Sequence, residues 1–508
     1  MAGLKGNGNK LFYGDNLDIL RRKIKDETVD LCYIDPPFNS KRNYNQIYNR
    51  VGKEDRAQAH AFIDTWTWDD LAIAGYEEIL ANDKGRFQPQ LVELIKGLEP
   101  VLGRDSLLAY LISMALRVTE IHRALKRTGT FFLHCDPTAS HYLKLVLDAI
   151  FCSAGGDFLN EIIWCYNVGG KSKRHFARKH DVIFWYSKGD DYFFDGTLSG
   201  LKRETGTKSF GGKMGTDKDG RRYQDKLVKA TGKYYRYYLD DPKIPEDWWI
   251  DINSIQSQSA ERLGYPTQKP EALLERILKT CSKDGATILD AYCGCGTTIA
   301  EAQKLKRKWI GMDITYQSIA LVLRRLEHTF GKAVLDAITL DGIPQDMKSA
   351  EALAHKKDDR LRKEFEKWAV LTYTNNRAVI NEKKGADAGI DGVAYFKTGK
   401  TDNAKIIFQV KSGGVKRNDI ATLRGDMERE GAALAILITL EEPSAPMKAE
   451  AKGAGHFKLE DMPKPYDKIS IVTVKEIIED EKRLEIPMSL EVFAAAKRAS
   501  ESEQIELL

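Results

Sequence analysis

Apolar residues recur in short runs along the chain, and two of these runs predict buried strands that end near an acid. The segment TVDLCYI, residues 28–34, is apolar and β-branched over the length of one strand. Asp35 follows it, and two consecutive prolines then end the strand because proline has no backbone N–H to donate. The segment ATILDAY, residues 286–292, has the same character and carries Asp290 near its end.

The second run opens a predicted β-α-β unit. TTIAEAQKLK has a helical pattern, KWIGMDI reads as the next strand, and Gly294 and Gly296 lie at the first turn. Asp313 lies at the end of the second strand, 19 residues after Gly294. An open α/β sheet holds a nucleoside in this way, with glycines that let the backbone approach and an acid for the ribose hydroxyls. The third glycine of the dinucleotide fingerprint is absent, which favours S-adenosylmethionine. On the glycines alone, an NAD or nucleotide site stays open.

Together, the two segments predict chemistry on an exocyclic amine. The lone pair of such an amine is delocalised into the base, so its N–H groups need acceptors that strengthen as positive charge develops. Asp35 supplies a carboxylate acceptor and the carbonyl of Pro36 a second one, while Pro37 brings no competing N–H. Phe38 adds a ring on which a base flipped out of the duplex can stack. The alternative is an ordinary turn capped by Asp35.

Residues 35–38 (DPPF) and 290–298 (DAYCGCGTT) resemble the catalytic motif and the donor loop of the DNA amino-methyltransferases. The catalytic motif comes before the donor loop along the chain, and this order resembles that of the β class, which includes type III modification subunits. YPTQKPEALLERIL (265–278) and GTFFLHCDPTASHYLKLVLDAIF (129–151) resemble further segments of that class, so the resemblance covers roughly residues 10–330. It implies an α/β fold, that of a Rossmann-like S-adenosylmethionine-dependent methyltransferase with permuted motif order.

The resemblance also implies which residues act. The catalytic residues would be Asp35, Pro36, Pro37 and Phe38. The residues that would hold the methyl donor are Thr267, Gln268, Lys269, Asp290, Tyr292, Gly294, Gly296, Thr297 and Asp313. Phe38, Tyr265 and Tyr292 depart from the commonest family residues, but each position keeps an aromatic ring.

An Asp as the first residue of the catalytic motif usually accompanies adenine N6 in this family, so adenine is the favoured target. Cytosine N4 is the competing target, and a DNA-binding regulator on an inactive methyltransferase fold is the rival class of protein. Methylation of cytosine C5 would need a cysteine after a proline, and the sequence has no Pro-Cys pair. The resemblance places the chain in a restriction-modification system, with double-stranded DNA as substrate and either a second copy or a restriction subunit as a further partner.

Length and composition fit this interpretation. A chain of 508 residues with 42% hydrophobic and 30% charged residues predicts a soluble protein of more than one domain. No apolar stretch approaches the roughly 20 residues that span a membrane. The seven cysteines show no zinc-type spacing, which favours reduced thiols and a cytoplasmic location. We predict a methyltransferase domain at residues 1–340, with a catalytic half at 10–160 and a donor-binding half at 260–335.

A region of different character separates the two halves. Residues 166–240 hold 17 Lys and Arg against 9 Asp and Glu, interleaved with aromatic residues. Such a surface suits phosphates and bases, and the β class has its target recognition between the halves, so we predict an inserted target-recognition region at residues 165–255. The alternative is an ordinary solvated face. His134 and His180 are interpreted as structural residues.

A polar connector at residues 341–360 precedes a predicted second α/β domain at 361–482 and a helical tail at 483–508. GIDGVAYF and AKIIFQVK predict paired strands that bring Asp391 close to Gln409 and Lys411. This pattern resembles the PD-(D/E)xK restriction endonucleases, especially the Mrr-type branch, with Asp391 as a Mg²⁺ ligand and Glu366 as a further one. Gln409 is neutral, so two readings stay open: a Mg²⁺-dependent nuclease, or a nuclease-like fold that only binds DNA.

Overall fold

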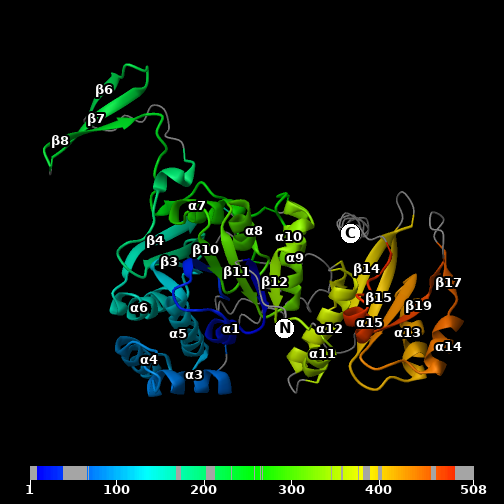
Figure 1. Cartoon of the computed structure of the whole chain (residues 1–508). Coiled ribbons are helices and arrows are strands. Elements are labelled where there is room, and N and C mark those ends of the chain that lie inside the picture. Colours follow the sequence, from blue (N-terminus) through cyan, green and yellow to red (C-terminus); the bar gives the residue numbers. More distant parts are fainter. Residues whose placement is uncertain are drawn as a thin grey trace. The chain divides into compact units, whose positions relative to one another are not determined.

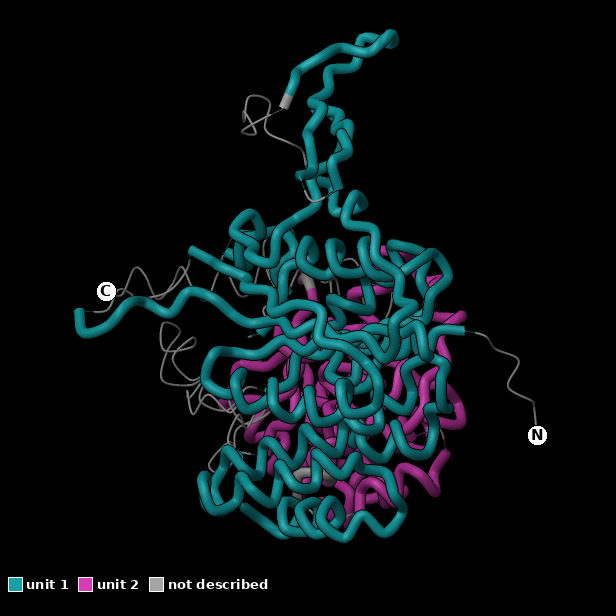
Figure 2. The backbone as a smooth tube through the Cα atoms, turned by 90° about the vertical axis from the view of Figure 1, so that its left-hand side faces the viewer, with its two compact units in different colours: residues 1–10, 15–41, 64–312 teal, residues 11–14, 42–63, 313–508 magenta. Residues whose placement is uncertain are grey.

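The computed structural model describes residues 8–37, 66, 68–167, 173–201, 212–229, 231–256, 258–263, 265, 267–344, 346–355, 359–375, 377–381, 389–398, 403–458 and 465–486. The chain divides into two compact units, which Figure 2 colours separately. The first unit takes residues 1–10, 15–41 and 64–312, and the second takes residues 11–14, 42–63 and 313–508.

The first unit contains seven strands of a nine-stranded sheet, in the order β11-β10-β2-β3-β5-β4-β9. Strands β3, β4, β10 and β11 are labelled in Figure 1. Strands β11, β10, β2 and β3 are parallel to one another, whereas β5 is antiparallel to β3 and β4. All of β2 except Asp30 is buried, as expected for a parallel strand covered on both faces. The bounds are β2 Val29–Ile34, β3 Leu125–Cys135, β4 Asp157–Cys165, β5 His180–Ser187, β9 Trp248–Trp249, β10 Thr287–Asp290 and β11 Lys308–Asp313.

Three helices of this unit, α1, α3 and α5, start at aspartates that cap them. Asp15, Asp69 and Asp105 each accept backbone N–H bonds at the start of a helix, which satisfies donors that have no partner within the helix. The bounds are α1 Asn16–Lys23, α3 Asp70–Ala81, α4 Pro89–Leu102, α5 Ser106–Ala124, α6 Ser140–Ile150, α7 Glu271–Cys281 and α8 Thr297–Lys304, with short 3₁₀ turns η2 Cys152–Ala154 and η3 Gly196–Ser199. The predicted strand, helix and strand around the glycines are therefore present as β10, α8 and β11.

A small antiparallel sheet lies within the predicted recognition region. It consists of β6 (Gly212–Thr216), β7 (Arg222–Val228) and β8 (Lys233–Tyr238), in that order.

The second unit contains a five-stranded mixed sheet in the order β13-β14-β15-β16-β19. Strands β14 and β15 are antiparallel, and β15, β16 and β19 are parallel. Helix α13 packs Ile420 and Leu423 onto Ile407 of β15. The strand bounds are β13 Val379–Ile380, β14 Gly392–Lys397, β15 Asn403–Lys411, β16 Leu434–Thr439, β17 His456–Phe457, β18 Tyr466–Asp467 and β19 Ile469–Thr473. The helix bounds are α12 Asp359–Tyr373, α13 Arg417–Arg429, α14 Ala445–Gly453 and α15 Val474–Glu479.

The long segment of the second compact unit begins at residue 313, and the domain boundary predicted at residue 340 stays a prediction. It includes α9 (Tyr316–Phe330), α10 (Ala333–Asp336) and β12 (Ile338–Asp341), which neighbours β1 (Asn9–Tyr13). Helix α9 joins this unit because the backbone N–H of Tyr316 donates to Glu364 of α12 at 2.8 Å, and its hydroxyl lies 3.1 Å from that of Thr372. The segment predicted as a connector contains a helix, α11 (Met347–Ala354), which Asp346 caps through a capping box.

These elements confirm the predicted α/β class and the Rossmann-like arrangement of a parallel sheet with helices. The helices in the described part of the chain are too short or too polar to cross a bilayer. Of the predicted tail, residues 487–508 lie outside the described residues.

Candidate active site

Two of the predicted segments meet at one edge of the parallel sheet. Strand β2 ends at Ile34 and is followed by Asp35, while the neighbouring strand β10 ends at Asp290. Because parallel neighbours share a carboxyl edge, the acid of the catalytic motif and the glycine loop that follows β10 lie at the same edge. Pro36 is buried after Asp35, and Phe38, the predicted stacking residue, lies outside the described residues.

The glycine loop needs its glycines for backbone conformation. Gly294 has a φ of 46° and Gly296 a φ of 75°, a region that residues with a side chain rarely adopt. A Cβ on Gly294 would also lie 3.0 Å from the hydroxyl of Tyr265. Gly296 caps α8, so the loop passes from a buried strand to a helix N-terminus through positions without side chains.

Other residues hold the start of this loop in place. The carboxylate of Asp290, which is 3% exposed, accepts the backbone N–H of Tyr292 at 3.0 Å. The side chain of Asn16 donates to the carbonyl of Ala291 at 2.8 Å, and Arg117 donates to Asn16 at 2.6 Å. No motif in the sequence indicated Asn16 or Arg117, since each lies far along the chain from the loop.

The structure places Lys269 beside Asp35, the predicted catalytic acid. Its ammonium lies 2.6 Å from Oδ2 of Asp35, and the two side chains are only 10% and 18% exposed. The hydroxyl of Thr297, the first residue of α8, donates to the carbonyl of Lys269 at 3.3 Å. Their contacts connect the glycine loop to Asp35, and the donor-binding role predicted for Lys269 and Thr297 stays a prediction.

The neighbouring predicted residues have other surroundings. The side-chain amide of Gln268 donates to the carbonyl of Glu261 at 2.6 Å and accepts the N–H of Leu263 at 2.8 Å, so Gln268 shapes its own segment. Thr267 is half-buried in the turn before Lys269. A role for Gln268 and Thr267 in donor binding stays a prediction.

Asp313 is the last residue of β11, two positions beyond Gly311, which is in register with Asp290. Its carboxylate accepts the backbone N–H of Thr315 at 2.9 Å and the hydroxyl of Thr315 at 3.1 Å. Thr315 caps α9, so Asp313 fixes the turn into that helix. The predicted contact of Asp313 with a ribose stays a prediction.

A buried chain of hydrogen bonds lies behind the catalytic motif. The hydroxyl of Tyr33 is 2.8 Å from Nδ1 of His134, Nε2 of His134 is 3.1 Å from Asp181, and Tyr166 donates to Asp181 at 3.1 Å. Burial alone would raise the pKa of Asp181, but the bond from His134 and the charge of Lys269 outweigh it and hold that pKa below its usual value. Burial, followed by the charge of Asp35, raises the pKa of Tyr33. His134 thus belongs to the surroundings of the site, which its sequence neighbours did not indicate.

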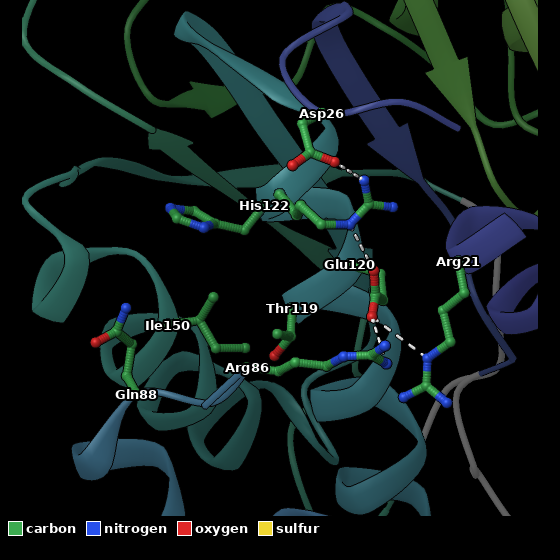
Figure 3. A pocket seen from close by; sticks show the side chains of 9 residues that line it. Arg21, Asp26, Arg86, Gln88, Thr119, Glu120, His122 and Ile150 are labelled. Atoms are coloured by element: carbon green, nitrogen blue, oxygen red, sulfur yellow. Dashed lines mark hydrogen bonds and ion pairs between the residues drawn. The ribbon is translucent and has the colours of Figure 1, made fainter. Parts of the chain in front are cut away.

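A separate cavity of about 450 Å³ is lined by Asp26, which precedes β2, and by Thr119 and Glu120 near the end of α5 (Figure 3). Its central feature is Glu120, which is 4% exposed and lies between three guanidinium groups. Arg21 of α1, Arg86 and Arg123 approach Glu120 at 3.3, 3.4 and 2.7 Å. These ion pairs fasten α1 to α5, and we assign them a structural role.

In the recognition region, part of the predicted positive charge is paired. Arg221 binds Asp240 at 2.8 Å and stacks over Tyr238, and Arg236 binds Asp225 at 2.9 Å and stacks over Tyr223. Several aromatic and apolar side chains of β6–β8 are nevertheless exposed, namely Met214, Leu227, Tyr234, Tyr235 and Tyr237. Because Arg221 and Arg236 are paired with carboxylates and the tyrosines are exposed, this sheet suits contacts with bases or sugars better than purely electrostatic binding of phosphates.

In the second unit, the structure brings together the residues of the predicted nuclease pattern. Asp391 precedes β14, and its carboxylate accepts the backbone N–H of Val410, between Gln409 and Lys411, at 2.7 Å. Burial, followed by the charge of Glu366, raises the pKa of Asp391 to about 7. Gln409 donates to the carbonyl of Gly389 at 2.9 Å, and its Oε1 is buried without a hydrogen-bond partner. In the described part of the chain, no group of three or more His, Cys, Asp and Glu is arranged to hold a metal ion.

The second unit also matches a family model. Residues 361–479 match the model described as NACHT-associated inactive Restriction Endonuclease 1. This match supports the predicted restriction-endonuclease-like fold and argues against the predicted Mg²⁺-dependent cleavage. The Mrr-type assignment stays a prediction.

Several characterised proteins are similar to the first part of the chain. DNA adenine methyltransferase YhdJ of Escherichia coli (strain K12) is 26% identical over 325 residues, which cover 63% of this chain and 84% of that protein. Type II methyltransferase M.EcaI of Enterobacter cloacae is 28% identical over 368 residues, which cover 62% of this chain and 69% of that protein. Among solved structures, the cytosine-N4-specific PvuII DNA methyltransferase aligns with a TM-score of 0.38 at 14% identity, over 66% of this chain and 95% of that one.

The DNA methylase model of the N6 and N4 methyltransferases matches residues 29–323, from β2 through the glycine loop and into α9. The match therefore includes Asp35, Lys269 and the glycines that the structure brings to one edge of the sheet. Because it spans more than half of the chain, the protein belongs to the DNA methylase family.

Proposed function

We propose that the protein transfers a methyl group from S-adenosylmethionine to N6 of adenine in duplex DNA, after the target base has been flipped out of the helix. The observation that carries this proposal is the placement of Asp35 beside the glycine loop at the carboxyl edge of β2 and β10. Asp as the first residue of the catalytic motif favours adenine over cytosine N4, and similar proteins include an adenine methyltransferase.

The glycine loop suits the methyl donor. Gly294 and Gly296 have positive φ and no side chain of their own, which lets the backbone at the start of α8 approach a bound nucleoside. Asp313 would take the ribose hydroxyls, while Asp290, Tyr292 and Thr297 would line the same edge. S-adenosylmethionine supplies a methyl group activated by a positively charged sulfur.

Asp35 would act on the amine. Its carboxylate accepts an N–H of the target amine, and this bond strengthens as the nitrogen becomes positive during the transfer. The new N–C bond forms as the C–S bond breaks, the sulfonium becomes a neutral thioether, and the surplus amine proton leaves through Asp35 to solvent. Binding of a flipped base would bring in the tyrosines of β6–β8, which we propose as part of the target-recognition surface.

The experiment is to express the chain in a host that lacks DNA methyltransferases and to sequence its DNA by a method that detects modified bases. Nucleoside mass spectrometry of the same DNA identifies the product, with Asp35→Ala as the control strain. We expect N6-methyladenine at one recognition sequence, absent in the control. N4-methylcytosine in its place would show the alternative target, and unmodified DNA would refute both.

A further inference from the structure

Asp35 forms an ion pair with Lys269, which is unusual for a carboxylate that only has to accept a proton from an amine. Both charges are largely buried, at 10% and 18% side-chain exposure, and they lie side by side at 2.6 Å. Removing an ammonium from water costs several kcal/mol, and a buried ion pair often adds no more stability than apolar residues of similar volume. The pair is therefore weakly explained by stability alone.

The surroundings of Lys269 also fix its position. Its carbonyl accepts the hydroxyl of Thr297 at the start of α8, and Pro270 and α7 follow it directly. The ammonium thus comes from a segment attached to the donor loop, whereas Asp35 comes from the end of β2. Two rigid elements present one hydrogen-bond donor and one acceptor at adjacent positions.

A flipped base presents a complementary pair of groups on its Watson–Crick edge. Adenine has the N6 amine, a donor, next to N1, an acceptor, and cytosine has the N4 amine next to N3. Guanine places its N1–H next to its amine, and thymine has no amine at all. An acceptor beside a donor therefore fits the two bases that carry a methylatable amine next to a ring acceptor.

We propose that Asp35 and Lys269 read this edge together, with Asp35 accepting from the amine and Lys269 donating to the adjacent ring nitrogen. The inference rests on the proposed function and adds a second contact to it. As the base enters, the ammonium of Lys269 exchanges part of its bond with Oδ2 of Asp35 for a bond to the ring nitrogen. Its positive charge therefore keeps hydrogen-bond acceptors throughout. A guanine would meet the ammonium with an N–H and would leave two donors facing each other.

The two contacts have different kinetic consequences. The bond from Asp35 strengthens while the amine nitrogen becomes positive, so its loss lowers kcat. The bond from Lys269 to the ring nitrogen is present before and during the transfer, so its loss weakens binding of the flipped base and is expressed mainly in KM. Lys269 is thus a positioning residue that sets which base edge is accepted.

The test uses a duplex with the recognition sequence found by sequencing and with 1-deazaadenine at the target position. This analogue keeps the amine and replaces N1 by C–H. We expect the wild-type protein to prefer adenine over the analogue by on the order of 10- to 100-fold in kcat/KM, the worth of one hydrogen bond to a charged group. In Lys269→Met the preference should fall to within a few-fold, and in Lys269→Arg, which keeps the donor and the charge, most of it should return.

The ratio of the two duplexes within each variant cancels any general loss of activity in that variant. Comparing this ratio between variants cancels the intrinsic reactivity of the analogue. Donor titration of each variant checks that the fold and the donor site are intact. An equal preference in wild type and Lys269→Met, or no preference in wild type, overturns the proposal. If sequencing finds methylated cytosine, the adenine assignment fails, and 3-deazacytosine then tests the same edge contact by the same comparison.

Discussion

Replacing Asp35 by Ala tests the acceptor role and the ion pair at once. The substitution removes the carboxylate that lies 2.6 Å from Lys269, whose side chain is 10% exposed. Loss of one partner from a largely buried pair costs about 2–4 kcal/mol of folding stability, against a usual total of roughly 5–15 kcal/mol. The protein should therefore still fold. Methyl transfer should fall by about 10²–10³-fold or more, as it does when a group that stabilises developing charge is removed.

The assay follows a labelled methyl group into DNA, with donor titration and thermal unfolding on the same preparations. The matched control is the double variant Asp35→Ala with Lys269→Met, which also removes the ammonium. We expect the double variant to recover much of the lost stability and none of the activity. The stability cost comes from the buried ammonium that has lost the Asp35 carboxylate, and the activity cost comes from the missing hydrogen-bond acceptor. Near-normal turnover in Asp35→Ala would refute the mechanism, and lost donor binding would show damage to the fold instead.

Three further experiments give separate outcomes. Gly294→Ala should weaken donor binding at least several-fold, because the φ of Gly294 is 46° and the new Cβ would lie 3.0 Å from Tyr265. The control is Gly97→Ala in the interior of α4, where the new Cβ meets open space, so donor titration should be unchanged. Burial raises the pKa of Glu301 to about 7, so the folded chain keeps a proton that the unfolded chain releases above about pH 4.5, and stability falls as pH rises from there to 7. Glu301→Gln should therefore raise stability by roughly 2–3 kcal/mol at pH 8 and by little at pH 4.5, and a difference independent of pH in thermal unfolding would contradict this. Unmethylated plasmid incubated with the protein and Mg²⁺ should stay uncut, as it should with Lys411→Ala, and cleavage that Lys411→Ala abolishes would restore the nuclease prediction.

The parts of the site that the sequence predicted are local in the chain. Asp35 follows an apolar run and precedes two prolines, and Gly294 and Gly296 stand between a strand and a helix, so neighbouring residues determine each feature. The shared edge followed from the rule that parallel strands in an α/β sheet end at the same side. The structure shows β2 and β10 as direct neighbours, which the spacing of the motifs alone did not require.

The parts that the sequence did not predict depend on side chains that meet across long separations. Lys269 lies 234 residues from Asp35, and Asn16 lies 275 residues from Ala291. His134 had no partner at ligand spacing in the sequence, and its partners Tyr33 and Asp181 come from neighbouring strands of the sheet. Only the strand order decides such contacts, and the strand order is a property of the whole fold.

The second unit shows why an arrangement of residues that resembles a nuclease site need not support Mg²⁺-dependent cleavage. A Mg²⁺ site needs several oxygen ligands, most of them charged. Here burial raises the pKa of Asp391 to about 7, and one of its oxygens accepts the N–H of Val410, both of which weaken it as a metal ligand. The position on β15 that could add a second carboxylate is Gln409, whose amide binds Gly389. Among the described residues, Asp391 and the nearby charge of Glu366 are therefore joined by a neutral amide, and Lys411 lies 4.0 Å from Asp419, so this part of the fold offers fewer charged oxygens than a Mg²⁺ site usually uses.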